Sequence, residues 1–302
     1  PGVYSDTEEL IELCKGLNSS LVTRHSALIY TSHMRSEGDT LIESIHEIIR
    51  IGREAKIKVH ISHIKTSGRE NWNKIDEAIA LIEKARKDGV AITCDRYPYT
   101  ASSTDLDTVL PSWTYDGGTE EELKRLGNPR MRKKIANEVL ASRPEGDYWK
   151  TIRISSVMTD KSRWMEGKTM AYIAGKLGKS CIDSLFKILI EEKLRVGAIF
   201  SSMSEENLER FLSLPYSMIG SDSSARCRSG ITCKGKPHPR GFGSFPRFLG
   251  RYVREKGLMS MSEAVHKITM LPAATFGLKN RGILKKGAFA DIAVFDPKGI
   301  ID

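Results

Sequence analysis

Two histidines and an aspartate lie where short apolar runs give way to polar residues, and together they could form a hydrolytic metal site. They are His33 after residues 28–32, His63 after residues 58–62 and Asp222 after residues 216–221. Zinc prefers neutral imidazole nitrogens and carboxylates, and a catalytic zinc site keeps one position open for water. The metal lowers the pKa of that water to about 7, and a nearby aspartate can accept its proton. These residue types predict metal-assisted hydrolysis of an amide.

The segments around these residues alternate between strand and helix patterns, which is typical of repeated β-α-β units. The sequence predicts strands at 28–33, 58–63, 90–95, 151–157, 196–201 and 216–222. It predicts helices at 40–54, 74–88, 166–195 (two helices), 244–256 and 261–277. A polar, helix-rich stretch near 105–150 has the composition of an insertion or lid. In a parallel α/β barrel the carboxyl ends of the strands converge on the active site.

The alternation of side chains along a strand predicts which residues share a face. Period two places His63 and Lys65 on the face of Val59 and Ile61, towards the barrel interior, and directs His60 to the helix layer. Two histidines on successive strands, each followed two residues later by a cation, favour a site. A single strand-end histidine is more simply a hydrogen-bonded polar residue, and Asp222 by itself equally suits a turn or a helix cap.

Composition and charge narrow the class of protein. The 302 residues are 40% hydrophobic and 28% charged, which allows a sizeable core. The net charge is +9, but Lys and Arg are interleaved with acidic residues on helices, which favours a solvated surface, so we expect no nucleic acid as a partner. A basic barrel mouth could draw in an anionic small-molecule substrate. No apolar run approaches the ~20 residues of a membrane span. Five cysteines without a CxxC spacing predict reduced thiols and a cytoplasmic protein.

Several motifs, in order along nearly the whole chain, resemble the D-aminoacylase (N-acyl-D-amino-acid deacylase) branch of the amidohydrolase superfamily. They are TSHMRSE at 31–37, ISHIK at 61–65, DRYPY at 95–99, IGSD at 219–222, HPR at 238–240, GSFPR at 243–247, GILKKG at 282–287 and ADIAVFDP at 290–297. The resemblance implies a TIM-like (β/α)8 barrel and zinc-dependent hydrolysis of N-acyl-D-amino acids to a carboxylate and a free D-amino acid.

The resemblance also implies roles for individual residues. His33 and His63 are expected to bind a tightly held zinc ion, and Asp222 to act as the general base and to touch a second, weaker metal position. The clamp on the substrate carboxylate is expected to consist of Lys65, Tyr97, Ser103 and Arg240. An arginine can bind a carboxylate through two hydrogen bonds, so it sets orientation as well as charge.

The sequence departs from the family pattern in what it lacks. It contains no His-x-His pair, and neither Cys14 nor Cys94 lies in the context of the family's bridging cysteine. We therefore expect a partial barrel over 1–280, with the insertion near 105–150, and strands of a small β-domain at 281–302. A chain without those ligands is expected to be inactive by itself and prone to association.

Other functions stay open from the sequence. One alternative is a cyclic-amide hydrolase of the dihydroorotase or hydantoinase type, although Arg240 and Lys65 suit a free α-carboxylate better. Another is a non-catalytic, oligomerising relative, which the intact His33, His63 and Asp222 argue against. The resemblance leaves a homo-oligomer open.

Overall fold

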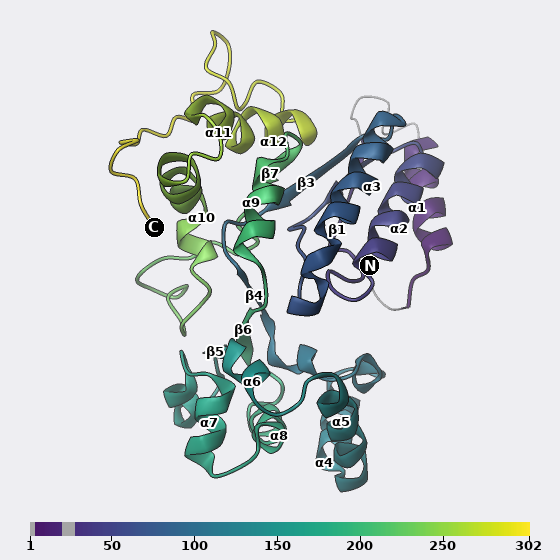
Figure 1. The fold of residues 1–302 in the computed structure, drawn as a ribbon, viewed down its shortest axis with the longest axis vertical. Coiled ribbons are helices and arrows are strands. Elements are labelled where there is room, and N and C mark those ends of the chain that lie inside the picture. Colours follow the sequence, from purple (N-terminus) through teal and green to yellow (C-terminus); the bar gives the residue numbers. More distant parts are fainter. Residues whose placement is uncertain (1–3, 20–27) are drawn as a thin grey trace. The chain divides into compact units, whose positions relative to one another are not determined.

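The computed structural model describes residues 4–19 and 28–302, and the chain divides into two units (Figure 1). Unit 1 contains Pro1–Thr100, Met203–Ser224 and Arg240–Asp302. Unit 2 contains Ala101–Ser202 and Ala225–Pro239. The insertion expected near 105–150 therefore lies inside a larger unit, and the strands predicted at 151–157 and 196–201 belong to that unit and not to the parallel sheet of unit 1.

Unit 1 contains a four-stranded parallel sheet with the strand order β1-β2-β3-β7. Its strands are β1 (Ile29–Ser32), β2 (Lys58–Ile61), β3 (Ile92–Arg96) and β7 (Ser217–Ile219). Its helices are α1 (Thr7–Ser19), α2 (Leu41–Glu54), the 3-10 helix η2 (Arg69–Lys74), α3 (Ile75–Lys87), α9 (Glu205–Ser213), α10 (Arg240–Arg247), the π-helix η6 (Phe248–Glu255), α11 (Met261–Ile268) and α12 (Met270–Thr275). Because the strands are parallel, their carboxyl ends meet at one edge of the sheet.

Helices α1, α2 and α3 lie side by side along the sheet (Figure 1). The apolar stripe of α2, with Ile45 and Ile48, shares one core with Val59 and Ile61 of β2. Gly52 lets α2 approach the sheet closely, because a Cβ atom there would lie 3.1 Å from Val59 Cγ1. This packing sets which face of β2 the helices cover.

The prediction that Val59 and Ile61 point away from the helices and His60 towards them is wrong. Val59 and Ile61 pack in the core shared with the helices, whereas His60 forms hydrogen bonds on the opposite face with Thr93 Oγ1 and Asp95 Oδ2, each at 2.8 Å. The strand ends at Ile61, and His63 adopts φ 42° in the turn that follows. A turn interrupts the period-two alternation, so the direction of His63 could not be extrapolated from the strand.

Unit 2 is built on an antiparallel sheet with the strand order β4-β6-β5. Its strands are β4 (Ala101–Asp105), β5 (Ile152–Ser156) and β6 (Gly197–Ser201). Its helices are η3 (Leu106–Val109), η4 (Ser112–Tyr115), α4 (Thr119–Gly127), α5 (Pro129–Ser142), α6 (Asp147–Thr151), η5 (Asp160–Met165), α7 (Met170–Leu177) and α8 (Cys181–Glu191). They enclose a core of their own around the fully buried Trp149.

The strands predicted at 281–302 are not found, since the structure describes this segment as turns and irregular chain. Its apolar residues remain exposed, with Leu284 at 83% and Val294 at 92%. A strand needs a neighbour that pairs with its backbone N–H and C=O groups, and no described strand pairs with this segment. In the described part of the chain, no helix is long and apolar enough to cross a membrane.

Candidate functional site

The two predicted metal ligands meet just beyond the carboxyl ends of β1 and β2. These strands pair with Ser32 opposite Ile61, so the residues that follow them emerge at the same edge. His33 Nδ1 and His63 Nε2 lie 3.0 Å apart. Two nitrogen ligands of a tetrahedral zinc ion, each at ~2.0–2.1 Å from the metal, would be ~3.3 Å apart. The pair therefore has close to the spacing that one metal ion requires.

Glu37, to which the sequence analysis assigned no role, completes a group of three. Each of His33, Glu37 and His63 offers one ligand atom, and these atoms all lie within 4.8 Å of one another. Glu37 Oε1 is 2.7 Å from His63 Nδ1 and also forms an ion pair with Lys65 Nζ. Glu37 meets His63 through Nδ1 and not through the Nε2 that faces His33, so it lies beside the nitrogen pair as the hydrogen-bond partner of His63. Glu37 lies inside the motif at 31–37, four residues after His33, and that spacing was the available signal.

Charges in this group keep the side chains in the forms that bind a metal. Burial by itself would raise the pKa of Glu37, but the charge of Lys65 and the hydrogen bond from His63 outweigh it and lower the pKa to about 2. Burial lowers the pKa of His33, and although the charge of Glu37 opposes this effect, His63 and Lys65 add to it, so the pKa stays below its usual value. His33 is therefore neutral at pH 7, which is the form of histidine that binds a metal.

Asp95, at the end of β3, supports the turn that carries His63. Its Oδ1 accepts a hydrogen bond of 3.0 Å from the backbone N–H of His63, a residue with φ 42°. Its Oδ2 lies 2.8 Å from His60 Nε2. Gly220 leaves room for this carboxylate, because a Cβ atom there would lie 2.7 Å from Asp95 Oδ1. A positive φ is uncommon outside glycine, so the bond to Asp95 helps to hold His63 in this conformation.

Lys65 and Arg240, two of the four residues predicted to bind a carboxylate, lie over the buried ring of a third, Tyr97. The distance to the ring centroid is 4.7 Å from Arg240 Cζ and 5.8 Å from Lys65 Nζ. Arg96, which the sequence analysis did not assign, lies at 4.1 Å. Cations over an aromatic face are attracted by its negative potential, so Tyr97 holds this positive group together. Ser103 belongs to β4 of unit 2, where it pairs with Ile199, and its role stays a prediction.

The predicted general base, Asp222, follows β7 and does not join the three-residue group of possible metal ligands. Its Oδ2 instead lies 2.6 Å from Arg240 Nη1. The Asp222 side chain is 34% exposed, whereas that of Arg240 is 8% exposed. The predicted base is therefore paired with a residue predicted to bind the substrate.

Comparisons with known proteins agree with the resemblance found in the motifs. Residues 196–302 match the amidohydrolase family. The whole chain is 35% identical to D-aminoacylase and 31% identical to N-acyl-D-glutamate deacylase, both from Alcaligenes xylosoxydans xylosoxydans, and it spans 51% of the length of each. It also superposes with a TM-score of 0.76 on the structure of N-acyl-D-glutamate deacylase from Bordetella bronchiseptica, complexed with zinc and a phosphonate inhibitor. This match has 31% identity and covers 100% of this chain and 52% of that one. The chain thus spans about half the length of these relatives.

Proposed function

We propose that the protein hydrolyses N-acyl-D-amino acids with the help of zinc. The proposal starts from the resemblance of this chain, along its whole length, to the D-aminoacylase branch of the amidohydrolases. The observation that carries this proposal is the His33–His63 nitrogen pair at 3.0 Å. Lys65 links the two parts of the site, because it contacts His63 and also lies over the Tyr97 ring. A metal-binding pair beside buried cations suits an amide substrate that bears a free carboxylate.

His33 Nδ1 and His63 Nε2 are the atoms that would hold the metal. A zinc ion bound there supplies a water whose pKa is lowered to about 7 and polarises the acyl oxygen. Asp222 would take a proton from the attacking water and pass it to the leaving amine. In support of the cofactor, a solved relative is described in complex with zinc. A second, weaker metal position beside Asp222 is part of the same proposal.

Lys65 and Arg240 would bind the substrate carboxylate, with Tyr97 as the surface on which both cations lie. Arg240 already holds the carboxylate of Asp222, so a substrate carboxylate would replace Asp222 as its partner. This exchange would release the base when a suitable substrate is bound. Ser103 is proposed as a further contact, from the resemblance alone. We also propose that the four parallel strands of unit 1 form part of a TIM-like barrel, as their helical crossovers suggest.

Zinc content and substrate preference test this proposal together. In a form of the protein that also carries the family's remaining metal ligands, we expect bound zinc and hydrolysis of N-acetyl-D-amino acids in preference to the L-enantiomers and to cyclic amides such as dihydroorotate. His63→Ala should lose the zinc because it removes one of the two nitrogens. His266→Ala is the matched control, because His266 is exposed on α11. Equal zinc contents in the two variants would show that His63 is not a ligand.

A further inference from the structure

We propose that Glu37 is a positioning residue, which orients the His63 ring for the metal and Lys65 for the substrate with a single carboxylate oxygen. The inference rests on the proposed function and deepens it. Glu37 Oε1 is the atom that contacts both His63 Nδ1, at 2.7 Å, and Lys65 Nζ. The Glu37 side chain is 14% exposed and that of Lys65 is 4% exposed, so water competes little for these contacts.

The contact with Glu37 decides which nitrogen of His63 carries the proton. An ionised carboxylate can only accept hydrogen bonds, so its contact with Nδ1 requires a proton on Nδ1. In the form that binds a metal, the ring then has its lone pair on Nε2, which faces His33 Nδ1. Lys65 Nζ also lies 2.8 Å from His63 Nδ1, and its protons are directed to Glu37 because Nδ1 has no lone pair left. Glu37 thus prepares Nε2 as a metal ligand.

The backbone around Glu37 is anchored, as a positioning role requires. The carbonyl of Glu37 accepts a hydrogen bond of 2.7 Å from the backbone N–H of Ser67, which follows Lys65 by two residues. Ser36 Oγ accepts from the N–H groups of Gly38 and Thr40, at 3.2 and 3.3 Å. The bond from Ser67 ties the loop after β1 to the loop after β2, and the bonds to Ser36 hold the first of these loops. The carboxylate therefore keeps its place when either of its partners moves.

One consequence is that Glu37 acts on two measurable quantities through two different partners. Through His63 it should set the affinity for zinc, and through Lys65 it should set the KM for substrates with a carboxylate. When Lys65 turns to a substrate, the Glu37 oxygen is left to His63 alone. Removing the hydrogen-bond partner of a metal-bound histidine, here Glu37, typically weakens metal binding by ~10- to 100-fold.

The test measures the zinc dissociation constant by competition with a chromophoric chelator, together with KM and thermal stability. We expect Glu37→Gln to weaken zinc binding by about 10- to 100-fold. The matched control is Glu47→Gln, since Glu47 is also a largely buried glutamate paired with a cation, Arg35, at 2.9 Å. This control should leave zinc binding unchanged. Lys65→Met removes the charge that lowers the pKa of Glu37 but keeps the glutamate beside His63, so it should raise KM and weaken zinc binding less than Glu37→Gln does.

A second substitution covers the case in which Glu37→Gln does not fold. Glu37→Asp keeps the charge but shortens the side chain, so it should weaken zinc binding less than the glutamine variant. Wild-type zinc affinity in the folded variant, with an active wild-type enzyme, would overturn the positioning role and leave the proposed function standing. A wild-type protein that binds no zinc would overturn the proposed function, and the positioning role with it.

Discussion

Replacing Arg240 with methionine should distinguish substrates that carry a free carboxylate from those that do not. The Arg240 side chain is 8% exposed, its Nη1 lies 2.6 Å from Asp222 Oδ2, and its Cζ lies 4.7 Å from the Tyr97 ring centroid. Methionine keeps a long apolar side chain and removes the charge. A carboxylate that takes the place of Asp222 would receive a charged hydrogen bond from a shielded guanidinium, and the variant cannot make that bond.

The size of the loss follows from the strength of that bond. A hydrogen bond to a charged group is worth ~1.5–3 kcal/mol, and every ~1.4 kcal/mol changes an equilibrium tenfold. We therefore expect kcat/KM for N-acetyl-D-amino acids to fall by roughly 10- to 150-fold. The corresponding primary amides carry no carboxylate, so their kcat/KM should change little. Removing Arg240 also frees Asp222, the proposed general base, from its ion pair. The turnover of amides should therefore not fall.

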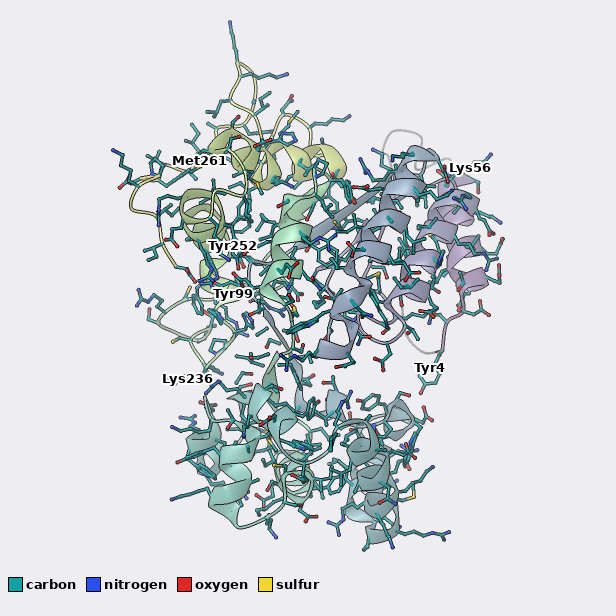
Figure 2. All side chains as sticks on the ribbon, viewed as in Figure 1. Tyr4, Lys56, Tyr99, Lys236, Tyr252 and Met261 are labelled. Carbon is teal, nitrogen blue, oxygen red and sulfur yellow. The ribbon has the colours of Figure 1, made fainter. Side chains whose placement is uncertain are left out.

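The assay compares kcat/KM for N-acetyl-D-amino acids and their amides in the wild type and in two arginine variants. Arg247→Met is a close control, because Arg247 Cζ also lies 4.7 Å from a tyrosine ring, that of Tyr99, and its Nη1 lies 3.1 Å from Asp302 Oδ2. Tyr99 and Tyr252 lie near α10 in the same unit (Figure 2). The control should keep the wild-type ratio of acid to amide activity. Equal losses on both substrates in Arg240→Met would refute its role in carboxylate binding.

Two further predictions concern single carboxylates. Asp222→Asn should keep the fold and the bound metal but lower kcat by roughly 10²- to 10⁴-fold, and near-normal turnover would place the base elsewhere. In unit 2, burial and then the charge of Asp107 raise the pKa of Glu122 from 4.5 to about 7. The folded state thus favours the protonated carboxyl, so its stability should decrease as pH rises from 4.5 through about 7. Glu122→Gln should weaken this pH dependence of the urea midpoint, and an unchanged dependence would contradict the assignment.

The sequence predicted the strands of unit 1 and the proximity of His33 and His63 because both depend on local patterns. Apolar periodicity predicted β1, β2, β3 and β7, and the structure confirms these strands with ends that differ by a few residues. Parallel strands then bring the residues after β1 and β2 to one edge, which is why His33 and His63 could be predicted to meet. Tyr97, Lys65 and Arg240 were grouped by the family resemblance, and the structure does bring them together.

Other features depend on contacts between segments that are distant in the sequence. The facing of β2 was predicted wrongly because the packing of the helices decides which face of the strand is covered. The direction of His63 depends in addition on a turn, with φ 42°, that a hydrogen bond to Asp95 of another strand supports. The pairing of Asp222 with Arg240 joins the two sides of the segment 225–239, which belongs to unit 2. The strands expected at 281–302 require a pairing partner, and apolar alternation by itself does not supply one.

The sequence by itself thus determined which residue types could bind a metal and an anionic substrate, and which strands carry them. Only the tertiary structure decided that Glu37 contacts both His63 and Lys65, and that Arg240 holds Asp222. The physical reason is that periodicity reports which side of a regular element is apolar, whereas a hydrogen bond between loops depends on turn geometry and on a partner from elsewhere in the chain.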